Sequence, residues 1–137
     1  MNTQTKAAVS RPISPHLQVY ALHTKITSLL SILHRIAGAG LMTVGTLFFL
    51  LWIVSAAGGE ASFTLVQEFY GSFFGFLVLF AWTVLLFYHF ANGIRHLLWD
   101  TGYGFEIPQI HFTGMVMLAG AAGLTVLTWI IGIIVFV

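Results

Sequence analysis

Three long apolar stretches dominate the chain: residues 36–57, 73–94 and 112–137. Each is long enough to cross a hydrocarbon core about 30 Å thick, which takes about 20 residues of α-helix. No stretch alternates between apolar and polar residues as the strands of a membrane barrel do. The pattern therefore predicts an all-α integral membrane protein whose three transmembrane helices form an up-down-up bundle.

The polar segments between these stretches predict the rest of the organisation. We expect residues 1–30 to be a cytoplasmic N-terminal arm and helix start, and residues 31–137 to be a three-helix transmembrane anchor domain. Pro12 and Pro15 keep residues 11 to 23 extended, because a residue before proline avoids the helical region. A helix is expected to start near residues 24–28, where hydroxyl side chains can cap it. Glycines at 55–62 and 99–108 predict the two connections.

Composition and charge support a membrane location and give it a direction. Only 7% of the 137 residues are charged, against roughly 25% in a typical soluble domain. The loop between the first two spans carries Glu60 and Glu68, whereas the basic residues all lie before the first span or at the end of the second: Lys6, Arg11, Lys25, Arg35 and Arg95. The positive-inside rule therefore predicts a cytoplasmic N-terminus. With little room for a transit peptide before Arg11, the bacterial inner membrane is favoured over the mitochondrial one.

His89 is a polar residue deep inside the second predicted span. It lies seven residues before His96, and so about 10 Å deeper along a helix that rises 1.5 Å per residue. Two interpretations stay open: a hydrogen bond to a neighbouring helix, or axial ligation of a buried haem. The absence of cysteine excludes covalent c-type haem attachment. No other histidine is expected at the depth of His89, His34 included, so a second axial ligand would come from another polypeptide, or the iron would be five-coordinate.

Four polar residues are expected together at the cytoplasmic end of the first two spans, namely His34, Arg35, Arg95 and His96. Cations there would stabilise the carboxylates of a haem, although Arg95 alone could equally be a topology anchor. Ser31 and Arg35 are four residues apart and share a helix face. A hydroxyl beside a guanidinium suits the carbonyl oxygens of a hydrophobic quinone. A helix-start serine beside a topology-setting arginine is an equally good interpretation.

Three segments together resemble, in order and spacing, the cytochrome b membrane-anchor subunit of succinate dehydrogenase, respiratory complex II. They are RPISPHLQVY, SILHRIAG and YHFANGIRHLLWDTGYG, within residues 11 to 104. The resemblance implies that His89 is the axial haem ligand and that Ser31 and Arg35 bind the quinone. It further implies haem propionate contacts by His34, Arg35 and His96. Asp100 closes the second motif and is a possible member of a proton route.

The resemblance also implies cofactors and partners. A haem b would be shared with a second small membrane-anchor subunit that supplies the other axial histidine, and ubiquinone would be the substrate. An iron-sulfur subunit and a flavoprotein subunit would bind at the membrane surface, with no role for nucleic acid. Succinate would be oxidised in the flavoprotein, so this chain would hold no succinate site. The alternatives are the anchor of a quinol:fumarate reductase, a haem-free structural anchor and, disfavoured by the few polar residues inside the spans, a small transporter or channel.

Overall fold

The computed structural model describes residues 26–136, and the side chains of residues 26–135. The predicted extended arm at residues 11 to 23 and the basic residues Lys6, Arg11 and Lys25 lie outside the described residues. Regular structure in the described part is helical throughout. Its elements are α1 (Ile26–Gly40), the π-helix η2 (Leu41–Gly45), α2 (Thr46–Ala57), α3 (Glu60–Gly71), α4 (Phe73–Asp100) and α5 (Ile107–Phe136).

Three of these helical stretches are long and apolar enough to cross a membrane: Ile26–Ala57, Phe73–Asp100 and Ile107–Val135. The predicted fold class is therefore confirmed. The helices extend beyond the apolar stretches, because the first begins at Ile26 rather than residue 36 and the second ends at Asp100 rather than residue 94. A backbone leaving hydrocarbon still needs its hydrogen bonds, so polar residues continue a helix into the interface. The boundary between arm and anchor domain at residue 30 stays a prediction.

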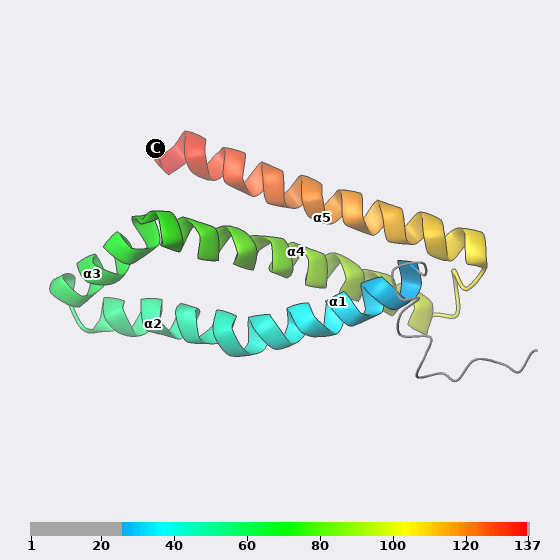
Figure 1. The fold of residues 1–137 in the computed structure, drawn as a ribbon, viewed down its shortest axis with the longest axis horizontal. Coiled ribbons are helices and arrows are strands. Elements are labelled where there is room, and N and C mark those ends of the chain that lie inside the picture. Colours follow the sequence, from blue (N-terminus) through cyan, green and yellow to red (C-terminus); the bar gives the residue numbers. More distant parts are fainter. Residues whose placement is uncertain (1–25, 137) are drawn as a thin grey trace, which may run out of the picture.

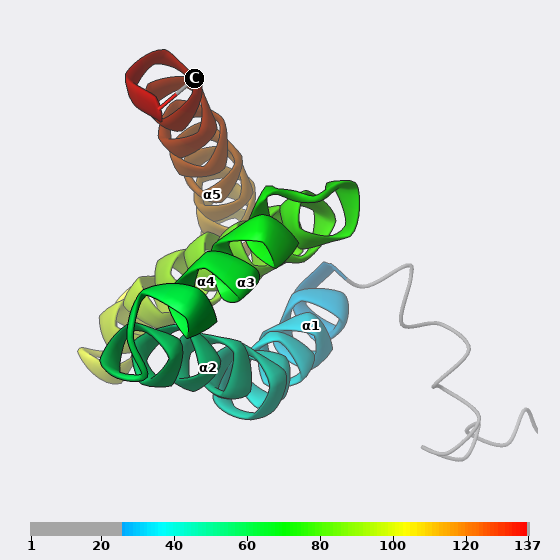
Figure 2. The same ribbon diagram turned by 90° about the vertical axis from the view of Figure 1, so that its left-hand side faces the viewer.

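The central helix of the bundle is α4. The continuous helix α1–η2–α2 runs antiparallel along one side of it, α5 runs antiparallel along another, and α3 joins α2 to α4 at one end (Figure 1). In addition to α4, helix α5 contacts α1 near the start of α5. The C-terminal part of α5 diverges from the other helices (Figure 2). We call the end where α1 begins and α4 ends the histidine end, and the opposite end the α3 end.

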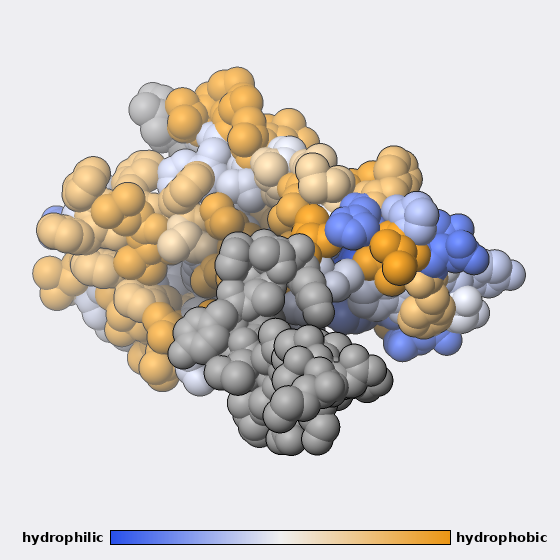
Figure 3. All heavy atoms as spheres, turned by 45° about the vertical axis from the view of Figure 1, so that its right-hand side comes forward, coloured by the Kyte–Doolittle hydropathy of each residue, from blue (hydrophilic) through white to orange (hydrophobic). Residues whose placement is uncertain are grey.

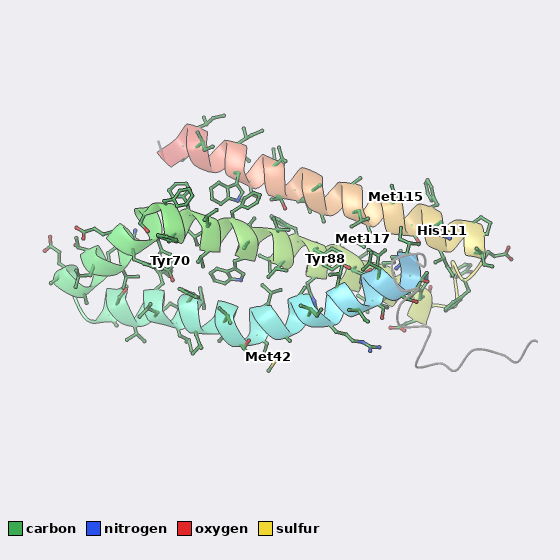
Figure 4. All side chains as sticks on the ribbon, in the orientation of Figure 1. Met42, Tyr70, Tyr88, His111, Met115 and Met117 are labelled. Carbon is green, nitrogen blue, oxygen red and sulfur yellow. The ribbon has the colours of Figure 1, made fainter. Side chains whose placement is uncertain are left out.

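Most large apolar side chains lie on the outside of the bundle, as expected for helices that meet lipid or other membrane subunits. Figure 3 shows hydrophobic residues over much of the visible surface and hydrophilic residues gathered toward the histidine end. Met42, for example, is 79% exposed and points away from the other helices (Figure 4). The buried residues include polar groups, which are Ser55, Asn92, Arg95 and Thr125.

The turn between α3 and α4 is made by a single residue, Ser72. Its extended backbone (φ −75°, ψ 162°) ends α3, and its hydroxyl oxygen caps α4 by accepting a hydrogen bond from the Gly75 amide at 3.2 Å. A Cβ at Gly75 would collide with the carbonyl oxygen of Phe69 and would lie 2.6 Å from the Cα of Tyr70. The close approach of the two helix backbones therefore requires glycine at this position.

Candidate functional site

Three imidazoles meet at the histidine end of the bundle. His34 of α1 stacks on His89 of α4, with ring centroids 4.0 Å apart and an angle of 5° between the planes. The same His34 ring lies 5.1 Å from that of His96, tilted by 48°. His34 thus lies between the two histidines of α4 and contacts both.

The expectation that no other histidine reaches the depth of His89 is wrong for His34. Depth along a single helix follows from residue spacing, but the register between two antiparallel helices does not. In the structure Gly38 lies directly opposite His89, which brings His34, one turn earlier in α1, against the same ring. His111, in contrast, is exposed at the start of α5, as Figure 4 shows.

His89 has one hydrogen bond, and that bond defines its tautomer. Its Nδ1 lies 3.2 Å from the backbone carbonyl oxygen of His34. A carbonyl oxygen only accepts, so this contact requires a proton on Nδ1, and in the neutral imidazole Nε2 then keeps its lone pair. Metal-ligating histidines usually donate their second ring nitrogen in this way, which orients the ring and increases its basicity. His89 therefore fits an axial ligand of a haem iron through Nε2.

The stacked arrangement of His34 does not suit the opposite axial position on the same iron. The His34 and His89 rings lie face to face, so their nitrogens do not point toward a common atom between the rings. The Nδ1 of His34 is buried and has no hydrogen-bond partner in the described part of the chain. Within residues 26–135, no group of three histidine or carboxylate side chains is placed to hold a metal ion by itself.

An open cavity of about 420 Å³ lies beside the histidines, between the start of α1 and the end of α4. Its wall combines three hydroxyl groups, a guanidinium, an imidazole, an indole and one aliphatic side chain. The lining residues are Thr27, Ser28, Ser31, Ile32, Arg95, His96 and Trp99. The cavity therefore offers polar hydrogen-bonding groups beside an aromatic surface, as sites for small amphiphilic ligands do.

Ser31 lines this cavity, but Arg35 does not. Four residues advance a helix by about 6 Å, and this places Arg35 beyond the cavity on the exposed side of α1. The two residues stay one turn apart on α1, but only Ser31 contributes to the cavity wall.

The cation in the cavity wall is Arg95. The sequence predicted only that Arg95 lies among the polar residues at the cytoplasmic end of the first two spans. It is 4% exposed, and its Nε donates to the Thr113 hydroxyl at 3.2 Å, while Nη2 donates to the Ile110 carbonyl oxygen at 3.0 Å. The guanidinium carbon lies 4.0 Å from the centre of the Trp99 ring, a cation–π contact. Arg95 thus joins α4 to α5 behind the cavity. Its position as the sole basic residue of the apolar second span was the available signal.

Two further polar residues of α4 were not identified from the sequence. Tyr88 lies between α4 and α1 (Figure 4), where its hydroxyl donates to the Leu30 carbonyl oxygen at 2.7 Å. Asn92 is fully buried, and within residues 26–135 neither its amide nitrogen nor its side-chain oxygen has a hydrogen-bond partner. Asp100, proposed for a proton route, is exposed at the last position of α4. Register between helices determines these environments, so spacing alone did not show them.

The fold and the site together define a class of protein: an α-helical membrane protein with a histidine cluster at one end of its bundle. A family model described as succinate dehydrogenase/fumarate reductase transmembrane subunit matches residues 7–128. A succinate dehydrogenase cytochrome b560 subunit of Reclinomonas americana is 40% identical over 130 residues, covering 90% of this chain and 87% of the relative. A cytochrome b556 subunit of the same enzyme from Paracoccus denitrificans is 38% identical over 122 residues, covering 89% and 92%.

These matches extend over most of the chain and include the segments in which the site residues lie. The chain therefore belongs to the family of transmembrane subunits of succinate dehydrogenase and fumarate reductase. It is a membrane subunit of an oxidoreductase complex.

Proposed function

We propose that this chain is the cytochrome b membrane-anchor subunit of a succinate dehydrogenase, contributing one axial ligand of a haem b and part of a ubiquinone site. The observation that carries the proposal is the hydrogen bond from His89 Nδ1 to the His34 carbonyl oxygen, which leaves Nε2 available for iron. The names of the relatives support it, since they are cytochrome b subunits of succinate dehydrogenase.

His89 would hold the haem, and neighbouring groups would bind its carboxylates. The haem supplies a one-electron carrier when it is bound. His34 and His96 lie against one another beside His89 and offer ring N–H groups to carboxylates. Arg35, exposed on the same helix as His34, would reach the propionates and the quinone from the outer face of α1. Because His34 is stacked on His89, the opposite axial histidine would come from a second small membrane subunit.

The cavity beside the histidines would bind the head group of ubiquinone. The Ser31 hydroxyl would donate a hydrogen bond to a quinone carbonyl oxygen, and Trp99 would cover the ring. Arg95 supplies a fixed positive charge in the wall, held by Thr113 and the Ile110 carbonyl oxygen. That charge favours negative charge developing on the quinone oxygens during reduction. Protons would enter from the histidine end, where His96 lines the cavity and Asp100 is exposed.

The complete complex would include a flavoprotein subunit and an iron-sulfur subunit docked at the histidine end. Succinate would be oxidised in the flavoprotein, and its electrons would reach the quinone cavity through the iron-sulfur subunit. We place the chain in a bacterial inner membrane with the histidine end toward the cytoplasm, since both described basic residues, Arg35 and Arg95, lie at that end.

Isolation of the complex in detergent tests this function. We expect two larger hydrophilic subunits, a second small membrane subunit, a reduced-minus-oxidised spectrum of b type, and reduction of ubiquinone by succinate. A complex without b-type absorption would contradict the haem assignment and would support the alternative of a haem-free structural anchor. A complex that reduces fumarate with quinol much faster than it oxidises succinate would instead support the fumarate reductase branch of the family.

A further inference from the structure

Gly38 has no side chain, and the His89 ring lies in the space that a side chain at this position would occupy. A Cβ at Gly38 would be 2.8 Å from Cε1 of His89, 3.2 Å from Nδ1 and 3.7 Å from Nε2. Real Cβ atoms essentially never approach another atom closer than 3.0 Å. The imidazole therefore packs directly on the backbone of α1, and it could not do so beside any other residue type without moving.

The same glycine exposes the carbonyl oxygen to which His89 is hydrogen-bonded. Gly38 follows His34 by four residues in α1, so the His34 carbonyl faces the Gly38 amide in the helical ladder. Cα–Cβ bonds tilt toward the helix N-terminus, and a side chain at position 38 would extend over that carbonyl. Without it, His89 Nδ1 approaches the oxygen to 3.2 Å from the neighbouring helix.

Neighbouring glycines do not share this environment. A Cβ at Gly40 would meet only Cδ1 of Leu85, at the ordinary contact distance of 3.9 Å, and one at Gly93 would meet nothing within 4 Å. Gly45 also packs on a ring of α4, that of Trp82, whose Nε1 a Cβ would approach to 3.0 Å, but among these glycines only Gly38 borders the imidazole. The three atoms nearest to a Cβ at Gly38 all belong to the His89 imidazole.

We propose that Gly38 is a positioning residue for the haem ligand. It acts through His89, by admitting the ring to the His34 carbonyl and so fixing both the tautomer and the direction of Nε2. This inference rests on the proposed function, in which His89 binds haem. Loss of a partner of this kind typically weakens metal binding about 10- to 100-fold.

The test compares Gly38→Ala with Gly40→Ala, each in the complete complex. For Gly38→Ala we expect about 10- to 100-fold faster loss of haem to a haem-scavenging protein. We also expect an upward shift of the haem reduction potential, because an imidazole without its Nδ1 acceptor is a weaker donor to ferric iron. Gly40→Ala should match the unmodified complex in both measurements. A Gly38→Ala complex with unchanged haem retention and potential would overturn the inference.

If the Gly38→Ala complex assembles poorly, a second comparison shows whether the cause is the His89 ring. It compares the His89→Ala complex with a complex that carries both His89→Ala and Gly38→Ala. If the glycine acts through the His89 ring, the added methyl group should cause no further loss of assembled complex once the ring is absent. A further loss in that background would overturn the inference. An unmodified complex that lacks haem would instead contradict the proposed function itself, so the two failures are distinguishable.

Discussion

The two ends of the bundle treat their polar groups differently. At the α3 end, polar side chains are satisfied within the chain: the Tyr70 hydroxyl donates to the Phe48 carbonyl oxygen at 2.7 Å, and the Ser62 hydroxyl donates to the Ser55 carbonyl oxygen at 2.8 Å. At the histidine end, buried atoms of His34 and Asn92 have no hydrogen-bond partner among the residues that the structure describes. Unsatisfied buried groups are costly. The difference indicates that the α3 end is closed by contacts among its own residues, whereas the polar groups of the histidine end need partners beyond residues 26–135.

The largest expected effect is the loss of haem on His89→Ala at the histidine end. This substitution removes Nε2 of His89, the nitrogen proposed to bind iron while Nδ1 is hydrogen-bonded to the His34 carbonyl oxygen. We expect most of the b-type absorption of the purified complex to disappear, while electron transfer from succinate to a soluble dye continues. His111→Ala is the matched control, since His111 is exposed on α5. Equal loss of absorption in both variants would contradict the assignment.

A substitution at the α3 end should affect stability instead. Gly75→Ala forces a methyl group into the backbone of the α3–α4 turn and should destabilise the fold by about 3 kcal/mol. A lowered thermal transition of the complex is the measurement. In the fraction that assembles, the haem band positions should stay unchanged. Gly71→Ala is the matched control, because a Cβ at position 71 would meet nothing within 4 Å and should have little steric effect. A shifted haem spectrum in Gly75→Ala would remove the distinction between the ends.

The same small change at the two ends should give different results. Ser31→Ala removes a hydroxyl from the cavity wall and should lower kcat/KM for ubiquinone about tenfold, the effect of roughly 1.4 kcal/mol. Succinate–dye activity should be retained. Ser62→Ala, at the α3 end, should leave the quinone kinetics unchanged. Quinone kinetics that respond to Ser62 and not to Ser31 would reverse the comparison.

The smallest effect is expected from Tyr70→Phe. This change removes one hydrogen bond, from the buried hydroxyl to the Phe48 carbonyl oxygen, and should cost about 1 kcal/mol of stability. Burial raises the pKa of the Tyr70 hydroxyl above its usual value, so the hydroxyl stays protonated and keeps donating through neutral pH. Thermal melts with and without the substitution measure the difference. An altered haem or quinone property would show that the α3 end is not separate.

The sequence predicted the three spans because lipid requires long apolar helices, and this signal needs no knowledge of packing. It also predicted two site residues: His89, a polar residue inside an apolar span, and Ser31, which shares a helix face with Arg35. It did not show that His34 contacts His89, that Arg95 rather than Arg35 lines the cavity beside Ser31, or that Gly38 borders the ligand ring. These features depend on the register between antiparallel helices. Residue spacing within one helix carries no information about that register.

Electron paramagnetic resonance of the oxidised complex tests the central claim most directly. If His89 is one of two axial histidines of the haem, the unmodified complex should show a low-spin ferric signal. That signal should be lost from the haem that remains in the His89→Ala complex. An unchanged low-spin signal after His89→Ala would contradict the claim that the histidine end of this chain holds the haem through His89.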